Sequence, residues 1–333
     1  MVSVAVCGVG VWGRNFVKNF YEIEDANLAF CYDQDERALA WVKENFPQIE
    51  VTSDFNEILK DKRIDAVVVA TPAATHFEIG KKALEAGKNV LIEKPLTLKS
   101  EEAEVLLNLA QKSKKKLMVG HLLKYHPAVL KIKSIIEEEK LGKVLYINSQ
   151  RLGLGRIREV ENVMWCLGVH DVYLVIYLLE MYPEKVAAFG KSFLQKEKGI
   201  EEVVSLNLFF KNDIFSHIYA SWLNAEKKRI TEVVCEKGTI VFDEVLSSLK
   251  IYRGEILKKK NKKGTFFEVK KGEEEIVEVE KKQPLKEECL HFINCIEENK
   301  TPLTDGKEGL HIVRVLEVAQ KSLKEGKILD IRF

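Results

Sequence analysis

The 333-residue sequence lacks any apolar stretch of the roughly 20 residues that a membrane-spanning helix requires. Residues 1–7 are apolar, but they carry no basic leader and run straight into a glycine. This start is not typical of a signal peptide, so we expect a cytoplasmic protein with no membrane partner. The sequence also lacks internal repeats and low-complexity segments.

A large net charge is missing too, because 52 basic side chains offset 51 acidic ones. No field of the whole molecule therefore draws the protein to nucleic acid, and any anionic ligand must be held locally. Paired C-x-x-C spacing, which would indicate zinc or a redox centre, is absent. We interpret most of the six scattered cysteines as small buried apolar residues: Cys7, Cys31, Cys166, Cys235, Cys289 and Cys295.

What the sequence does contain is typical of a globular protein, with 46% hydrophobic and 31% charged residues. Its length favours two domains. We predict an NAD-binding domain over residues 1–122 and a substrate-binding and oligomerisation domain over residues 123–333.

The first 120 residues alternate short apolar runs with longer amphipathic stretches, the rhythm of successive βαβ units. The nearly continuous apolar character of the runs suits a parallel sheet covered on both faces. Helices are predicted over residues 74–86 and 100–113, the second with Ser100 as its cap. The predicted strands are residues 2–7, 27–32, 66–70, 89–92 and 116–119.

After residue 140 the runs become longer and alternate in polarity, which predicts an antiparallel sheet. Its strands are expected at 203–210, 214–222, 230–235 and 239–242, and helices at 285–298 and 307–324 close the chain. Residues 258–263 form a lysine run that we interpret as a solvated hairpin loop rather than a basic patch, since glutamates follow it. The fold class is therefore α/β, with a Rossmann domain and an α+β domain built on a large open, mostly antiparallel sheet.

The segment V-A-V-C-G-V-G-V-W-G places Gly8, Gly10 and Gly13 in G-x-G-x-x-G register after a predicted strand. In a dinucleotide site these glycines serve a tight turn, close approach to the pyrophosphate, and close helix packing. The helix that follows adds N–H donors and partial positive charge at its N-terminus. Asp33 ends the second strand, 20 positions past Gly13 (33 − 13), where its carboxylate suits the ribose hydroxyls of NAD. Arg37 lies nearby and leaves NADP open.

Two further residues are candidates for the chemistry. Lys94 follows the predicted strand 89–92, and the carboxyl ends of parallel strands face the ligand crevice. His170, with Asp171, begins a predicted helix that runs on to residue 179. From position alone, a structural lysine is as open an interpretation as a functional one, whereas a lone histidine on an apolar helix is more often a core residue.

Several motifs together resemble the Gfo/Idh/MocA family of sugar and polyol dehydrogenases. They are the glycine loop, Asp33, A-T-P-A-A-T-H (70–76), E-K-P (93–95) and V-H-D (169–171), and the resemblance covers essentially the whole chain. Other motifs are similar to the branch that oxidises the 3-hydroxyl of UDP-N-acetylated hexoses before an aminotransferase acts: G-H-L-L-K-Y-H-P-A (120–128), L-G-R-I-R (154–158), V-M-W-C-L-G-V-H-D (163–171), S-W-L-N-A-E-K-K-R (221–229) and P-L-T-D-G-K-E-G-L (302–310).

The resemblance implies that Lys94 is the catalytic lysine and His170 the catalytic histidine in hydride transfer to NAD. An imidazole, with its usual pKa of about 6.5, is a suitable base for the hydroxyl proton. Lys94 would stabilise the developing alkoxide. Many family members carry Asp four residues before this histidine, whereas this chain has Cys166. That departure puts the proton relay of the family in doubt.

The resemblance also gives two sets of expected binding residues. For the cofactor NAD they are Gly8, Gly10, Val11, Trp12, Gly13, Asp33, Arg37, Thr71, Pro72, His76, Glu93, Lys94, His121 and Trp165. Trp165 is equally well interpreted as a core residue. For the sugar and diphosphate, local cations are the expected partners, because the protein as a whole is nearly neutral. Solvated surface charge is the alternative interpretation, and we favour it for at least half of these cations. The set is Lys94, Lys124, Tyr125, Arg156, Arg158, Asn162, His170 and Lys227.

Three functions remain open at this point. The first is an NAD-dependent 3-dehydrogenase of a UDP-N-acetylhexosamine or of the corresponding uronate, and the second is a dehydrogenase of free sugars or polyols such as inositol or glucose. The third is an NAD-binding regulatory protein without catalysis, which the missing aspartate keeps possible. Relatives usually assemble through their C-terminal sheets, so we expect a homodimer or homotetramer.

Overall fold

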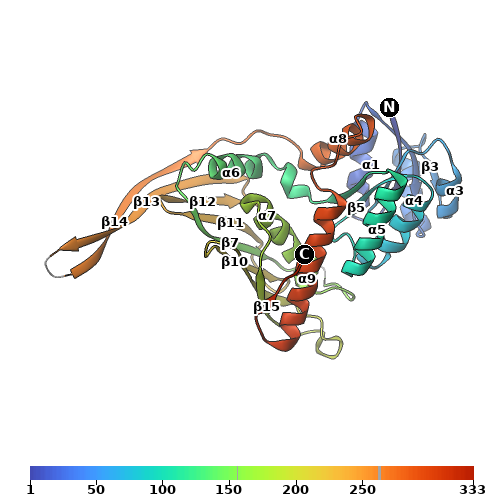
Figure 1. Ribbon diagram of the computed structural model, residues 1–333. Coiled ribbons are helices and arrows are strands. Elements are labelled where there is room, and N and C mark those ends of the chain that lie inside the picture. The colour runs from blue at the N-terminus through green and yellow to red at the C-terminus, as the bar shows by residue number, and fades with distance from the viewer. Residues whose placement is uncertain (156, 262–263) are drawn as a thin grey trace. The chain divides into compact units, whose positions relative to one another are not determined.

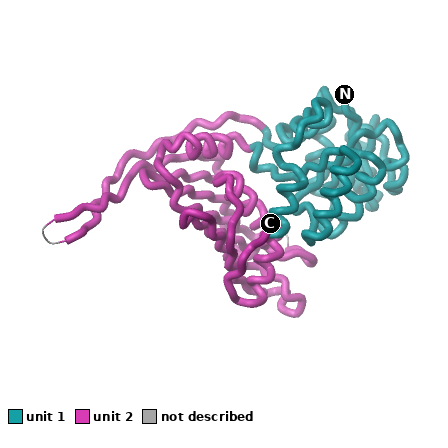
Figure 2. Tube along the Cα trace, in the orientation of Figure 1, with its two compact units in different colours: residues 1–125, 283–314 teal, residues 126–282, 315–333 magenta. Residues whose placement is uncertain are grey.

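The computed structural model describes residues 1–155, 157–261 and 264–333. They form two compact units, one of residues 1–125 and 283–314 and one of residues 126–282 and 315–333 (Figure 2). The sequence predicted a single boundary after residue 122. The chain instead returns to the first unit near its end, because helix α8 packs against helix α1 and strand β1.

The first unit contains a six-stranded parallel sheet in the order β3-β2-β1-β4-β5-β6. This is the strand order of the dinucleotide-binding Rossmann fold. All four residues of β4 are buried, as the predicted coverage on both faces requires. The strands are β1 (Val2–Cys7), β2 (Ala26–Tyr32), β3 (Glu50–Thr52), β4 (Ala66–Val69), β5 (Asn89–Glu93) and β6 (Leu117–Gly120).

Helices cover this sheet and complete its core. Phe16 and Phe20 of α1 are fully buried beside Val4 and Val6 of β1, and Phe292 of α8 joins the same cluster. The α-helices of the unit are α1 (Gly13–Glu22), α2 (Glu36–Asn45), α3 (Phe55–Lys60), α4 (His76–Glu85), α5 (Ser100–Ser113), α8 (Pro284–Glu297) and the first part of α9 (Gly306–Glu325), with short 3₁₀ turns η1 (Ala73–Thr75) and η2 (Leu122–Tyr125).

The second unit is built on a nine-stranded sheet in the order β14-β13-β12-β11-β7-β10-β9-β8-β15. The predicted antiparallel pairing is confirmed, with one exception: β7 and β10 run parallel. The strands are β7 (Val144–Leu152), β8 (Lys185–Lys191), β9 (Val203–Phe209), β10 (Phe215–Ser221), β11 (Lys228–Cys235), β12 (Gly238–Asp243), β13 (Ser248–Asn261), β14 (Gly264–Val277) and β15 (Leu329–Asp330).

Helix α7 (Val169–Leu179) packs on β7 and β10, and a π-helical turn, η3 (Met164–Gly168), leads directly into it. Nearly all of α7 is buried, which agrees with its almost uninterrupted apolar sequence. Helix α6 (Pro127–Glu137) packs against α7, and a 3₁₀ turn, η4 (Lys196–Lys198), precedes β9. Within the described parts of the chain, no helix is both long and apolar enough to cross a membrane.

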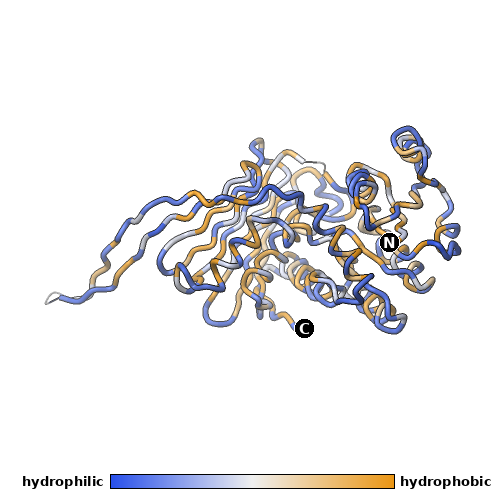
Figure 3. Tube along the Cα trace, turned by 90° about the horizontal axis from the view of Figure 1, so that it is seen from above, coloured by the Kyte–Doolittle hydropathy of each residue, from blue (hydrophilic) through white to orange (hydrophobic). Residues whose placement is uncertain are grey.

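Two local predictions were wrong. Helix α5 begins at Ser100 but has Lys99 as its N-cap, so Ser100 is not the cap. Lys258 to Lys260 lie in strand β13 and not in a loop, because β13 and β14 continue as a long paired hairpin (Figure 1). Opposite charges across the hairpin, such as Lys259 with Glu268, support this extension. Its alternation of hydrophilic and hydrophobic stretches is visible in Figure 3.

Candidate active site

The glycine loop connects β1 to α1, and two of its three glycines are required by the fold itself. Gly8 has φ +90°, and a Cβ there would lie 2.8 Å from the backbone of Ala70. A Cβ on Gly13 would lie 1.8 Å from the carbonyl oxygen of Gly8. A Cβ on Gly10, by contrast, would meet nothing within 4 Å in the described structure. The protein alone therefore gives no reason for a glycine at position 10.

The backbone of this loop presents hydrogen-bond donors. The N–H groups of Gly10, Val11 and Trp12 have no acceptor among the described residues. They stand at the N-terminus of the ten-residue helix α1, where N–H groups and the helix dipole favour an anion. This cradle, with open space above Gly10, fits the pyrophosphate of a dinucleotide.

Asp33 lies directly after β2 and holds the loop in shape. Its Oδ2 accepts a hydrogen bond of 2.6 Å from the N–H of Val9, and its Oδ1 accepts one of 2.9 Å from the N–H of Asp35. Each carboxylate oxygen retains acceptor capacity for ribose hydroxyls. Arg37 forms an ion pair with Asp35, with 3.0 Å between Nη2 and Oδ2, and its side chain is 92% exposed.

Trp12 links the glycine loop to the end of β5. Its indole N–H donates to Oε1 of Glu93, while Oε2 of Glu93 accepts the backbone N–H of Lys94 at 3.0 Å. Glu93 is buried, and burial raises the pKa of its carboxyl although Lys94 and Trp12 favour the ionised form. Glu93 therefore joins the pyrophosphate loop to the backbone that carries the predicted catalytic lysine.

The segment after β4 lies against the same loop. Thr71 is adjacent to Gly8, and the hydroxyl of Thr75 donates to the carbonyl oxygen of Pro72 at 2.8 Å. His76 is buried with Nδ1 2.8 Å from the carbonyl oxygen of Pro95 and Nε2 2.9 Å from that of Thr71. Burial lowers the pKa of His76, although both carbonyls favour its protonated form. His76 thus ties the Thr71 segment to the residue after Lys94.

His121, Lys124 and Tyr125 lie in the interior of the first unit. Nδ1 of His121 is 2.7 Å from Oε1 of Glu308, and Nζ of Lys124 forms an ion pair with the other oxygen of that carboxylate. These two partners outweigh burial and hold the pKa of Glu308 below its usual value. The ring of Tyr125 packs on His291. Lys124 and Tyr125 are buried, and these contacts fix their side chains. The substrate contacts that the sequence suggests for both stay predictions.

His170 is the second residue of α7, in the other unit. Its Nδ1 lies 3.0 Å from the hydroxyl oxygen of Tyr173, one helical turn further on. The adjacent Asp171 is buried and forms a two-point ion pair with Arg151 of β7, with Nε–Oδ2 3.0 Å and Nη2–Oδ1 3.2 Å. A third bond, from the Ser149 hydroxyl, also reaches Asp171 at 3.2 Å. Asp171 therefore fastens α7 to the sheet beside His170.

Asn162 and Trp165 are fixed by structural hydrogen bonds. Nδ2 of Asn162 donates to Glu201 and to Gln320, and Oδ1 accepts the N–H groups of Met164 and Trp165. These four bonds use the full capacity of an asparagine side chain, so Asn162 holds the first two N–H groups of the π-helical turn. The substrate contact that the sequence suggests for Asn162 stays a prediction. Trp165 is buried and donates its indole N–H to Gln320 at 3.3 Å.

The side chains of the other predicted substrate-binding residues are more exposed. Nε of Arg158 is 3.7 Å from Oε1 of Glu161, and its side chain is 43% exposed. Lys227 is exposed, and Cys166 is half-buried in the π-helical turn. Arg156 lies outside the described residues.

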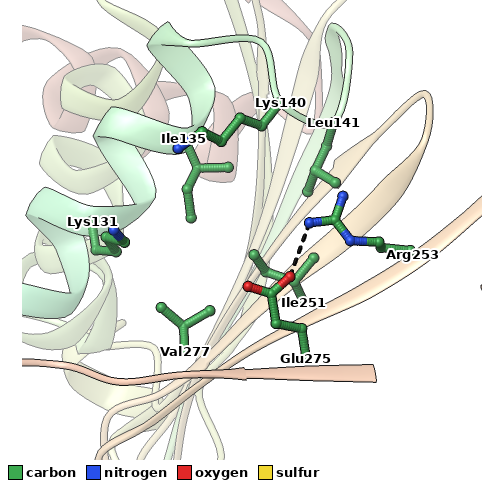
Figure 4. Close-up of a pocket in the computed structure, with 8 residues that line it drawn as sticks. All are labelled: Lys131, Ile135, Lys140, Leu141, Ile251, Arg253, Glu275 and Val277. Carbon is green, nitrogen blue, oxygen red and sulfur yellow. Dashed lines mark hydrogen bonds and ion pairs between the residues drawn. The ribbon is translucent and has the colours of Figure 1, made fainter. Parts of the chain in front are cut away.

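A small pocket elsewhere in the second unit contains none of the predicted residues. Figure 4 shows it between α6 and the base of the β13–β14 hairpin, with the guanidinium of Arg253 paired to Glu275 at 2.9 Å. Its two lysines come from α6 and the segment that follows it, and Arg253 is already neutralised. This pocket therefore adds nothing to the chemistry around Gly10, Lys94 or His170.

The sequence missed Glu308, Tyr173 and Arg151. Glu308 is 187 positions from its partner His121, and no local pattern indicates such a pair. Tyr173 carried a usable signal, because residues three apart on a helix are neighbours. Its apolar neighbours in the sequence do not distinguish Tyr173 from an ordinary core residue.

Comparison with known families identifies the fold and the class of reaction. Residues 2–121 match the model described as an oxidoreductase family with an NAD-binding Rossmann fold. Residues 129–241 match the GFO/IDH/MocA C-terminal domain. The chain belongs to the Gfo/Idh/MocA oxidoreductase family. As a member it is an NAD-dependent oxidoreductase acting on CH–OH groups, and the open cradle above Gly10 agrees with that cofactor.

Relatives of known name cover nearly the whole chain. The chain is 27% identical to UDP-N-acetylglucosamine 3-dehydrogenase of Acidithiobacillus ferrooxidans over 319 residues, which are 94% of each protein. It is 26% identical to myo-inositol 2-dehydrogenase of Thermotoga maritima over 340 residues, covering 99% of this chain and 98% of the relative. A solved structure of the Acidithiobacillus enzyme superposes with a TM-score of 0.83 at 24% identity, covering 97% of this chain and 98% of that one.

Proposed function

We propose that the protein oxidises the 3-hydroxyl of a UDP-N-acetylated hexose, UDP-N-acetylglucosamine or the corresponding uronate, to the 3-keto sugar that an aminotransferase then consumes. The observation that carries this proposal is the similarity to UDP-N-acetylglucosamine 3-dehydrogenase along 94% of both chains. The motifs at residues 120–128, 154–158 and 221–229 support the same branch of the family.

The first unit supplies the cofactor contacts in this proposal. The free N–H groups of Gly10, Val11 and Trp12 bind the pyrophosphate, and Asp33 accepts hydrogen bonds from the ribose. Thr71 and Glu93 line the same end of the sheet, where β4 and β5 terminate. NAD, when bound, accepts the hydride that leaves the sugar carbon.

Lys94 and His170 perform the proton chemistry. Oxidation removes the hydroxyl proton as the hydride departs, so His170 takes that proton through its Nε2. The ammonium of Lys94 donates a hydrogen bond to the same oxygen and stabilises the negative charge that develops on it. The hydrogen bond from the Lys94 N–H to Glu93 fixes the backbone from which this side chain extends.

The charged part of the substrate needs local cations on a protein with a net charge of +1. Arg158 and Lys227 remain in this set, together with Arg156. We add Arg229 of β11, which faces the same side of the sheet as its cross-strand neighbour Arg151. Nη1 of Arg229 donates to two backbone carbonyls, of Leu152 and Lys228, and the residue forms no ion pair among the described residues.

Turnover with a panel of substrates tests the proposal. The purified protein is incubated with NAD and either UDP-N-acetylglucosamine, its uronate, myo-inositol or glucose, and NADH is followed by its absorbance. We expect NADH with at least one UDP-sugar, and loss of that activity in Lys94→Ala and His170→Ala. Turnover of inositol or glucose, and of neither UDP-sugar, would overturn the nucleotide-sugar assignment.

The similarity to myo-inositol 2-dehydrogenase over 99% of the chain favours a second candidate, a dehydrogenase of free polyols. The same panel separates the two, because a polyol enzyme has no use for the UDP moiety.

We further propose that the protein forms a homodimer or homotetramer in the cytoplasm. Light scattering of the purified protein measures the mass of that assembly directly.

A further inference from the structure

We infer that Tyr173 is the positioning residue that orients His170, in place of the aspartate that many family members carry one helical turn before the histidine. This inference rests on the proposed role of His170 as the base. It explains how the chain can use a histidine base while carrying Cys166 at the aspartate position.

The contact itself is direct. The hydroxyl oxygen of Tyr173 lies 3.0 Å from Nδ1 of His170, within normal hydrogen-bond range. The two rings meet edge to face, with centroids 5.7 Å apart and an interplanar angle of 63°. Both residues belong to α7, three positions apart, so the helix itself sets their separation.

Tyr173 is well fixed, as a positioning residue must be. It is among the largest fully buried side chains, with 1% of its surface exposed. Helix α7 is fastened to β7 by the Asp171–Arg151 ion pair, so the segment that carries both His170 and Tyr173 cannot shift easily along the sheet.

The consequence concerns the tautomer of the imidazole. In neutral histidine, one ring nitrogen carries the proton and the other accepts, and the hydrogen bond of one nitrogen decides the state of the other. When Nδ1–H donates to the Tyr173 oxygen, Nε2 carries the lone pair that takes the substrate proton. An aspartate would fix the same tautomer. The neighbouring carboxylate, Asp171, is bonded to Arg151 and Ser149.

The test replaces Tyr173 by phenylalanine, which keeps the buried ring and removes only the hydroxyl. Tyr219→Phe is the matched control, because Tyr219 lies on the other face of β10 from the buried Ile218 and Ala220. Nitrogen NMR of ¹⁵N-histidine-labelled protein, with His170→Gln to assign the signal, reads the tautomer without any substrate. Steady-state kinetics of both variants with the substrate found in the panel give kcat and KM.

We expect the wild type and Tyr219→Phe to hold His170 with the proton on Nδ1, and Tyr173→Phe to show a mixture or the Nε2–H form. We also expect kcat to fall about 10- to 100-fold in Tyr173→Phe with KM for NAD unchanged, the effect of losing one hydrogen bond to a group that becomes charged. Identical His170 signals in wild type and Tyr173→Phe overturn the inference, whatever the substrate is. A protein that turns over neither UDP-sugar contradicts the proposed function and leaves the NMR result to decide the tautomer.

Discussion

Substituting the glycines of the loop one at a time separates those the fold needs from the one the ligand needs. A Cβ on Gly13 would overlap the carbonyl oxygen of Gly8 at 1.8 Å, and only backbone movement relieves such a contact. Forcing extra atoms into a packed site costs about 1–3 kcal/mol. For a unit of this size each kcal/mol lowers Tm by about 2–4 °C, so Gly13→Ala should melt roughly 2–12 °C below the wild type.

Gly10→Ala should behave in the opposite way. Its Cβ meets no protein atom within 4 Å, and the backbone at Gly10 lies outside the left-handed region. A compatible Gly→Ala change stabilises a protein by about 0.4–1 kcal/mol, so Tm should stay constant or rise slightly. The methyl group occupies the space that the pyrophosphate needs, and overpacking of about 1–3 kcal/mol weakens NAD binding roughly 5- to 150-fold.

The assay is a thermal melt of each variant without and with NAD, together with a calorimetric titration of NAD. We expect Gly10→Ala to match the wild type in the first melt and to lose the NAD-induced rise in Tm. If Gly10→Ala binds NAD as tightly as the wild type does, the cradle described here is not the pyrophosphate site. If Gly13→Ala melts like the wild type, the packing argument for that glycine is wrong.

Three further changes test other parts of the structure. Trp12→Phe keeps the ring but removes the donor to Glu93, so the unfolding free energy should fall by about 1–3 kcal/mol; equal urea midpoints would refute the link. Glu288 is fully buried, its two oxygens have no partner among the described residues, and burial raises its pKa. The unfolding free energy of the wild type therefore falls as pH rises above the usual carboxyl range. The difference in unfolding free energy between Glu288→Gln and the wild type should grow in favour of the variant by up to about 1.4 kcal/mol per pH unit; a difference that stays constant between about pH 5 and 8 would contradict this. Asn162→Ala removes the acceptor of the Met164 and Trp165 N–H groups and should lower the unfolding free energy by about 1–3 kcal/mol in chemical denaturation, whereas an unchanged midpoint would show that these bonds are dispensable.

Much of the first unit follows from its sequence, because parallel strands and the glycine loop leave local signals. Residues 2–7 and 100–113 form the strand and helix that their periodicity predicts. Strand β3 escaped prediction because it has only three residues, of which one is buried. The return of α8 and part of α9 to this unit also escaped, since apolar periodicity says that a helix packs somewhere but not against which sheet.

The candidate site was predictable in part, for a similar reason. Gly8, Asp33 and Lys94 stand at strand ends, where chain order alone determines that they meet at one edge of a parallel sheet. The sequence predicts Lys124 as a substrate contact because an anionic ligand on a nearly neutral protein needs local cations, and Asn162 stands in the same predicted set. Their partners, Glu308 and Gln320, come from α9, more than 150 positions away, and only folding reveals that they occupy those polar groups.

Transfer of a labelled hydride tests the central claim most directly. UDP-N-acetylglucosamine and its uronate, each carrying deuterium at C3, are incubated with the protein and NAD, and the reduced cofactor is analysed by mass spectrometry. The proposed reaction predicts that the reduced nicotinamide carries one deuterium and that the sugar becomes the 3-keto product. Reduced cofactor without the label, or no reduced cofactor from either UDP-sugar, would contradict the proposed oxidation at C3.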